Sequence, residues 1–121
     1  MILQNDKLLK QLLEKEDLAR VSNESYIKYL SLIGKIDEVK VKEVLDSYGD
    51  QKWWLSNEIK TRAFGQLFEP TLVIPLEEMH NGISEILERP VFNNEFELTL
   101  GRLKTQVMQV IAEELEESSE R

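Results

Sequence analysis

Paired carboxylates are the residues of this 121-residue sequence whose types and spacing come nearest to a chemical motif. Glu14 is followed three positions later by Asp17, and Glu43 is followed in the same way by Asp46. Side chains three residues apart lie on one face of a helix, so each pair can present two carboxylates together. Carboxylate oxygens suit magnesium. The spacing therefore allows a magnesium site, provided that the two helices face one another.

A magnesium-dependent, all-α nucleotide hydrolase is the function that such a site would support, because those enzymes hold the metal between acidic pairs on facing helices. We keep this function as an alternative hypothesis, with the four carboxylates above as ligands. The sequence holds 23 Asp and Glu residues, so similar pairs also arise by chance. Two more pairs follow in amphipathic stretches where acids face solvent anyway, namely Glu85/Glu88 and Glu113/Glu116.

The one histidine, His80, closes a Glu-x-x-His pattern that begins at Glu77. Di-iron bundles use this pattern from two helices, and the chain offers it once. There is no cysteine, which excludes thiolate metal sites, disulfides and cysteine nucleophiles. We expect no metal and no cofactor, and we interpret His80 as a partly buried structural residue.

No catalytic motif accompanies these residues. The segment Gly82-Ile83-Ser84-Glu85 lacks the final glycine of the serine-hydrolase elbow Gly-x-Ser-x-Gly. The five glycines are never closer than 15 residues, so they cannot form a phosphate-binding loop. We therefore expect a protein that is not an enzyme.

The stretch 53–87 is the centre of the predicted fold, since it holds both tryptophans and the longest apolar run. Apolar residues recur there at helical spacing over 58–68 and 76–88, on either side of a β-prone segment at 71–74. Gly65 predicts a close approach by a neighbouring element. At least one of Trp53 and Trp54 is expected in the core, and the other could serve as an interface hot spot.

Helical periodicity also occurs at 6–20, 23–34, 38–48 and 100–117, although 39–42 and 95–100 alternate as a strand would. We predict a mainly α, single-domain bundle of about five helices over 1–117, with 118–121 as a frayed acidic tail. Extended structure is expected through about residue 97. A short two-stranded β element, pairing 71–74 with 91–97, could accompany the helices.

The net charge of −8 lies entirely in the second half of the sequence. Residues 1–62 carry 11 basic and 11 acidic side chains, whereas residues 63–121 carry 4 basic and 12 acidic ones. Such an acidic half repels phosphate backbones, which argues against direct nucleic-acid binding. It either keeps the protein soluble or steers a basic partner toward it.

The sequence thus favours a small acidic module that binds another protein, of the inhibitor, immunity, antitoxin or adaptor type. The residues expected to carry the binding are Trp53, Trp54, Glu77, Glu78, Glu85 and Glu88. A homo-oligomeric structural subunit is a further alternative. No signal peptide and no apolar stretch of membrane-spanning length is visible, so we expect a cytoplasmic protein without membrane contact.

Overall fold

The computed structural model describes residues 4–13 and 21–119, and these residues are mainly helical. They form seven α-helices and one short 3₁₀ turn, without a β-strand among them. The expected β element is therefore wrong, and the count of about five helices was too low. The elements in chain order are α1 (Gln4–Leu13), α2 (Asn23–Ile33), α3 (Glu38–Ser47), η1 (Trp53–Leu55), α4 (Ile59–Leu67), α5 (Leu76–Leu87), α6 (Asn93–Leu98) and α7 (Leu100–Ser119).

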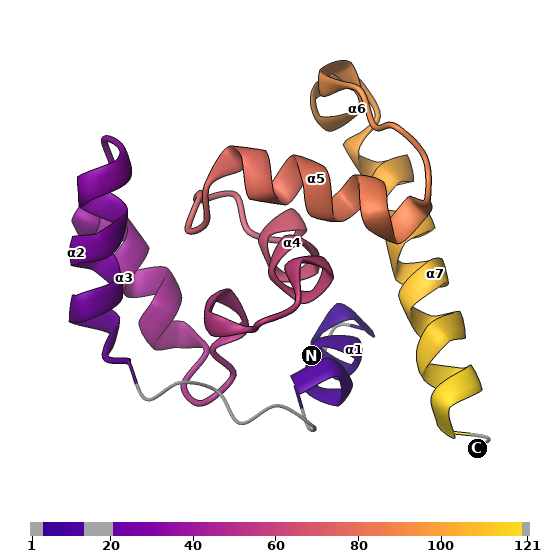
Figure 1. The fold of residues 1–121 in the computed structure, drawn as a ribbon, viewed down its shortest axis with the longest axis horizontal. Helices are drawn as coiled ribbons and strands as arrows, with labels where there is room; N and C mark the ends of the chain where they lie inside the picture. Colours follow the sequence, from indigo (N-terminus) through magenta and orange to yellow (C-terminus); the bar gives the residue numbers. More distant parts are fainter. Residues whose placement is uncertain (1–3, 14–20, 120–121) are drawn as a thin grey trace.

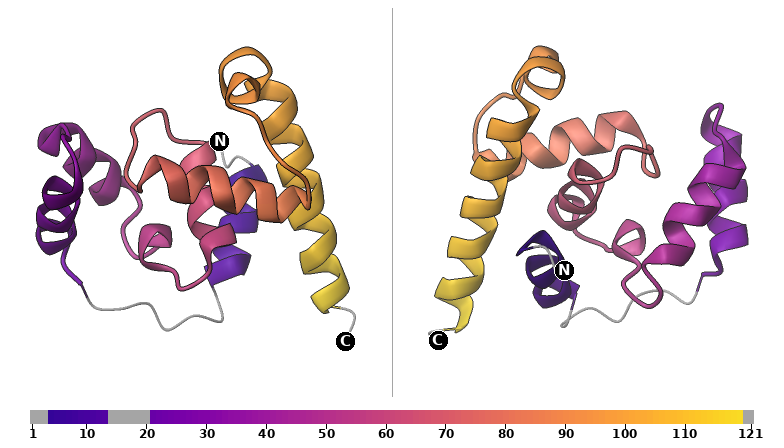
Figure 2. Two further views of the ribbon diagram at one scale, coloured as in Figure 1. Left: turned by 45° about the horizontal axis from the view of Figure 1, so that its top comes forward. Right: turned by 180° about the vertical axis from the view of Figure 1, so that it is seen from behind.

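The helices α4 and α5 cross at the centre of the molecule, and the other elements flank them (Figure 1). The antiparallel pair α2 and α3 forms one side, whereas the long helix α7 forms the other (Figure 2). Helix α1 lies against both α4 and α7, and α6 packs beside the first turns of α7. Helix α5 therefore spans the molecule between its two sides.

Two glycines allow the central elements η1, α4 and α5 to pack closely against one another. A Cβ atom on Gly65 would lie 2.3 Å from the indole ring of Trp53, and one on Gly82 would lie 2.4 Å from the Cβ of Ala63. Both distances are shorter than any real contact, so only glycine fits at these positions. The role that the sequence predicted for Gly65 is the one that the structure shows.

Two helices begin at residues that the sequence marks as caps. The hydroxyl of Ser22 accepts a hydrogen bond from the amide of Ser25 at 3.1 Å, and the carboxylate of Asp37 accepts one from the amide of Lys40 at 3.2 Å. The cap at Asp37 explains why 39–42 forms the first turns of α3 rather than a strand. The pattern of apolar side chains alone allows either a helix or a strand at 39–42, and the capping hydrogen bond favours the helix.

In the segment 71–74, Val73 and Ile74 are buried, and a side chain rather than a strand satisfies their backbone amides. The carboxamide oxygen of Gln66 accepts hydrogen bonds from the amides of Val73 and Ile74 at 2.7 and 3.1 Å. Its nitrogen donates to the carbonyls of Glu69 and Thr71 at 3.2 and 2.9 Å. Because these groups already have partners, the segment needs no second strand.

The expected partner strand, 91–97, is instead largely helical, since α6 begins at Asn93. The Glu95 carboxylate accepts a hydrogen bond from the amide of Phe92 at 2.8 Å, which holds the start of this helix. The alternation of Phe96, Leu98 and Leu100 suggested one buried face, yet the Leu98 side chain is 77% exposed. These residues do not share a face, so the strand signal was misleading.

Candidate functional site

A surface groove of about 570 Å³ runs between α5 and α6. It receives residues from the first two turns of α5 and from the inner side of α6. Its lining residues are Leu76, Glu77, His80, Asn81, Asn93, Phe96 and Glu97. Among these described residues there are two glutamates and neither a lysine nor an arginine, so the groove combines apolar surface with negative charge.

One exposed apolar side chain lies in this groove, and a second one precedes α6. Leu76, the first residue of α5, is 63% exposed, although the nearby residues Val73 and Ile74 are buried. Phe92, which immediately precedes α6, is 66% exposed. Together with Phe96, the exposed Leu76 gives the groove an apolar surface that a partner can bury.

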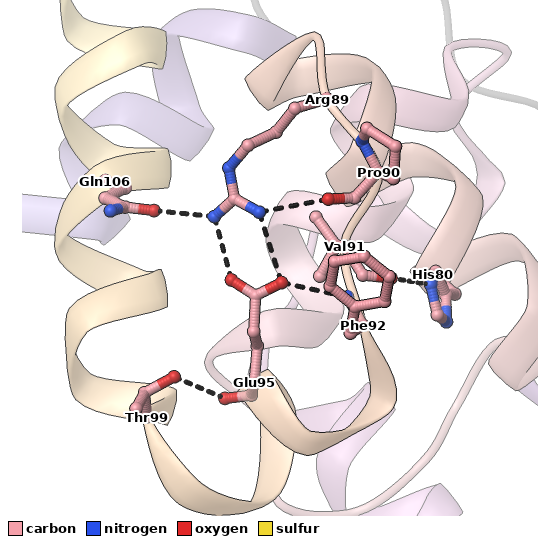
Figure 3. A network of polar contacts seen from close by, with 8 residues as sticks. All are labelled: His80, Arg89, Pro90, Val91, Phe92, Glu95, Thr99 and Gln106. Atoms are coloured by element: carbon pink, nitrogen blue, oxygen red, sulfur yellow. Dashed lines mark hydrogen bonds and ion pairs between the residues drawn. The ribbon is translucent and has the colours of Figure 1, made fainter.

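The position of α6 is fixed by an ion-pair network around Glu95 (Figure 3). The guanidinium of Arg89 donates to both carboxylate oxygens of Glu95, at 2.8 and 3.1 Å, and also to the side-chain oxygen of Gln106 on α7 at 3.0 Å. The hydrogen bonds from Arg89, and then the one from the Phe92 amide, hold the pKa of Glu95 below its ordinary value. The network ties the end of α5, the start of α6 and α7 together.

His80, on the α5 wall of the groove, contacts the segment that joins α5 to α6. Its Nε2 atom is hydrogen-bonded to the carbonyl oxygen of Val91 (Figure 3), so Nε2 carries the proton. The imidazole ring also packs against Phe96, with ring centroids 5.6 Å apart. His80 is thus half-buried and positions the loop before α6, which agrees with the structural role expected from the sequence.

The glutamates expected to carry binding do not all share one surface. Glu77, Glu85 and Glu88 are exposed, and with Asn81 they follow one side of α5 at intervals of four, four and three residues. Glu78 lies on a different side, where its carboxylate accepts hydrogen bonds at 2.6 and 3.0 Å from the guanidinium of Arg62. Glu78 therefore stabilises the contact between α4 and α5 instead of facing a partner.

Both tryptophans lie in the core. Trp53 is 0% exposed and Trp54 is 2% exposed, and their rings meet edge to face at a centroid distance of 5.5 Å. Trp53 packs on Gly65, and Trp54 lies against Tyr26 at 6.4 Å between ring centroids. The sequence led us to expect at least one buried tryptophan, and the structure buries both. Neither ring is therefore exposed to a partner.

The proposed magnesium ligands are only partly covered by the structure. Glu14 and Asp17 lie outside the described residues. Asp46 on α3 binds within the protein, since Lys42 donates to it at 2.9 Å and Asn23 at 2.8 Å. The bond from Lys42 is the main reason why the pKa of Asp46 is lowered. Within 4–13 and 21–119, no group of three or more potential metal ligands comes together.

Comparison with known proteins adds no family to this description, since no family model, no curated protein and no solved structure matches the chain. Over the described ranges, no helix has the length and apolar character needed to cross a membrane.

Sequence reasoning predicted the helix that forms one wall of the groove, but it predicted neither the groove nor the helix that forms the other wall. Leu76, Glu77, His80 and Asn81 lie on a helix that the apolar periodicity predicts, so their common face could be anticipated. Phe96 and Glu97 lie on α6, where the strand-like alternation concealed a short helix. The residue that could have revealed α6 is Glu95, a helix-favouring acid three positions after Phe92. Its carboxylate can accept a hydrogen bond from the Phe92 amide and so cap the start of the helix.

Proposed function

We propose that this protein binds a segment of another protein in the groove between α5 and α6, and that the segment presents apolar side chains flanked by lysine or arginine. The observation that carries this proposal is the composition of the groove. Leu76 and Phe96 supply apolar surface, whereas Glu77 and Glu97 supply carboxylates, and the lining includes neither lysine nor arginine. A basic, amphipathic segment complements both properties at once.

Each part of the groove contributes differently to such binding. Removing apolar surface from water supplies most of the affinity, at roughly 25 cal/mol per Å². The carboxylates contribute orientation and a faster association, because exposed charges act mainly through steering. The row formed by Glu77, Glu85 and Glu88 extends this negative potential along α5, beyond the groove itself.

A rigid wall favours this function. Helix α6 has only six residues and would not hold its place unaided. The Arg89–Glu95 ion pair and the His80–Val91 hydrogen bond fix it before any partner arrives. Preorganisation of this kind reduces the entropy lost on binding. An inhibitor, immunity protein, antitoxin or adaptor would use such a site to cover a basic surface of its target.

The direct test is a fluorescence-anisotropy titration with a labelled synthetic peptide that carries leucines at helical spacing and lysines at its flanks. We expect binding that weakens as salt is raised, and loss of binding in the double variant Glu77→Lys/Glu97→Lys. The matched control is Glu113→Lys/Glu117→Lys, which changes the net charge equally on exposed positions of α7. The control should retain most of the affinity.

Two outcomes would count against the proposal. If the control and the groove variant lose affinity equally, the peptide responds to overall charge and the groove has no special role. If the unmodified protein does not bind the peptide at all, the groove does not select this chemistry. Glu78 is left unchanged in every variant, because replacing it would break the ion pair with Arg62 and confuse binding with stability.

A further inference from the structure

A second exposed apolar surface lies on α2, at the far side of the molecule from α6 (Figure 1). We define the α2 face by Tyr29, Leu32 and Ile33, which are spaced three and four residues apart and are all exposed. Leu32 is 85% exposed, the highest value among the large apolar side chains of the described residues. Helix α2 uses Tyr26, Ile27 and Leu30 for the core, so the α2 face lies outside this buried stripe and borders it at Tyr29, whose ring contacts that of Tyr26.

Basic side chains flank the α2 face. Lys28 is exposed one helical turn before Leu32, and Lys35 is exposed just beyond the end of α2, after Gly34. Glu24 is the one acidic residue within α2, and it faces Lys42 of α3 at 3.5 Å. Asp37 follows the helix, but its carboxylate caps α3 through the amide of Lys40. The α2 face is thus apolar, with one lysine beside it on the helix and a second lysine just past the end of the helix.

These properties are the ones that the α5–α6 groove requires of its ligand. We propose that the α2 face of one copy of this chain binds the α5–α6 groove of a second copy. Leu32 would lie against Leu76 and Phe96, and Lys28 and Lys35 would approach Glu77 and Glu97. The proposal rests on the proposed function, which it deepens by naming a second copy as the segment that is bound.

The arrangement of the two surfaces decides the type of assembly. They lie on opposite sides of one molecule, so they cannot meet within a single chain (Figures 1 and 2). Contact between unlike surfaces is heterologous, and it continues from copy to copy as a ring or an open filament. The net charge of −8 on every copy opposes this assembly. We therefore expect weak, concentration-dependent association that is favoured at physiological salt, where the Debye length is about 8 Å.

The test uses two variants of the full chain that each lack one surface. Leu32→Asp removes the centre of the α2 face, and Glu77→Lys/Glu97→Lys reverses the charge of the groove. Sedimentation velocity is measured for each protein at rising concentration in about 0.15 M salt. We expect the unmodified chain to sediment as species larger than dimers, and each variant alone to remain a monomer.

The mixture of the two variants gives the decisive result. Each variant retains the surface that the other lacks, so an equimolar mixture should form a heterodimer, which cannot grow because both of its free ends are disabled. A contact between two identical α2 faces would give no such heterodimer. The control Leu98→Asp removes an equally large exposed leucine and adds the same charge on the side of α6 away from the groove. It should associate as the unmodified chain does.

A monomer at every concentration, or a mixture that does not form the heterodimer, overturns the proposal. The peptide titration then separates this failure from that of the proposed function. If the peptide binds while the copies stay apart, the groove serves another protein and the second copy is excluded. If the peptide does not bind and the copies do not associate, both proposals are wrong.

Discussion

The side-chain oxygen of Gln66 lies 2.7 Å from the backbone nitrogen of Val73 and accepts its hydrogen bond. One carboxamide thereby supplies the acceptor that a neighbouring strand would otherwise provide for the buried amides of Val73 and Ile74. Gln66 is itself only 2% exposed, and it uses both its oxygen and its nitrogen. The chain can thus leave α4, cross the core and enter α5 without a sheet.

Replacing Gln66 with methionine should destabilise the protein strongly. Methionine has a similar length, but it leaves the buried amides of Val73 and Ile74 without an acceptor. Each such group costs about 1–3 kcal/mol, so the free energy of unfolding should fall by about 2–6 kcal/mol in urea denaturation. The control Gln109→Met changes an exposed glutamine of α7 and should stay within about 0.5 kcal/mol. Equal stability of the two variants would show that the carboxamide does not hold the segment.

The same residue shows where sequence reasoning stops. The caps at Ser22 and Asp37, the glycine at Gly65 and the positions of most helices follow from local rules about spacing and backbone preference. The partner of 71–74 does not, because a strand and a buried glutamine satisfy a backbone amide equally well. Which of them is present depends on tertiary packing. The groove depends in turn on α6, so only its α5 wall could be anticipated.

Tyr26 should make the protein sensitive to alkali. Its hydroxyl donates to the carbonyl of Val73 at 2.7 Å, and burial, reinforced by the charge of Glu78, raises the pKa of this phenol well above its ordinary value. Above about pH 10 the unfolded chain loses this proton while the folded protein keeps it. The stabilising contribution is therefore complete below about pH 10. It is lost as the pH rises, at about 1.4 kcal/mol per pH unit.

The measurement is the free energy of unfolding at about pH 8 and about pH 11. Tyr26→Phe should be less stable than the unmodified protein at the lower pH, by about 0.5–1.5 kcal/mol for the lost hydrogen bond. Its stability should then decline less steeply toward the higher pH. Tyr29→Phe, which alters a half-exposed phenol, serves as the control and should decline like the unmodified protein. Parallel declines in all three proteins would contradict the assignment to Tyr26.

Glu88 offers a stabilising substitution. It ends α5 in the left-handed region, with φ 53° and ψ 38°, and the next amide, that of Arg89, donates back to the carbonyl of Ser84 at 3.2 Å. Glycine is the usual residue at this position of a helix end, because it has no Cβ to clash. Glu88→Gly should therefore raise the free energy of unfolding by about 0.5–1 kcal/mol, measured by urea denaturation.

A second variant separates the backbone effect from the charge effect. Glu88→Ala also removes a negative charge from a helix C-terminus, which is worth about 0.3–1 kcal/mol, but it keeps a Cβ. The glycine variant should be the more stable of the two. Equal gains would mean that the charge alone is responsible. Because Glu88 belongs to the exposed acidic row of α5, peptide binding by both variants should change to the same small extent.

Glu95 links the stability of α6 to the proposed binding. Its pKa is lowered by Arg89 and by the Phe92 amide, so the contribution of its carboxylate is complete above the ordinary pKa of about 4.3. This contribution is lost as the pH falls through the lowered pKa that Glu95 has in the folded protein. Glu95→Gln should abolish this pH dependence and speed hydrogen exchange at the Phe92 amide, whose hydrogen bond it weakens. Exchange measured by NMR, over a series of falling pH values, tests both expectations.

The functional consequence of Glu95→Gln should be weaker peptide binding, although Glu95 is not among the residues that line the groove. The wall formed by Asn93, Phe96 and Glu97 depends on α6 being held in place, and a loosened wall must be ordered again when the ligand binds. Glu97→Gln is the informative comparison, because it changes the groove directly but leaves the network of Figure 3 intact. It should weaken binding without speeding exchange at Phe92. If Glu95→Gln speeds that exchange and leaves the affinity unchanged, α6 is not part of the binding surface.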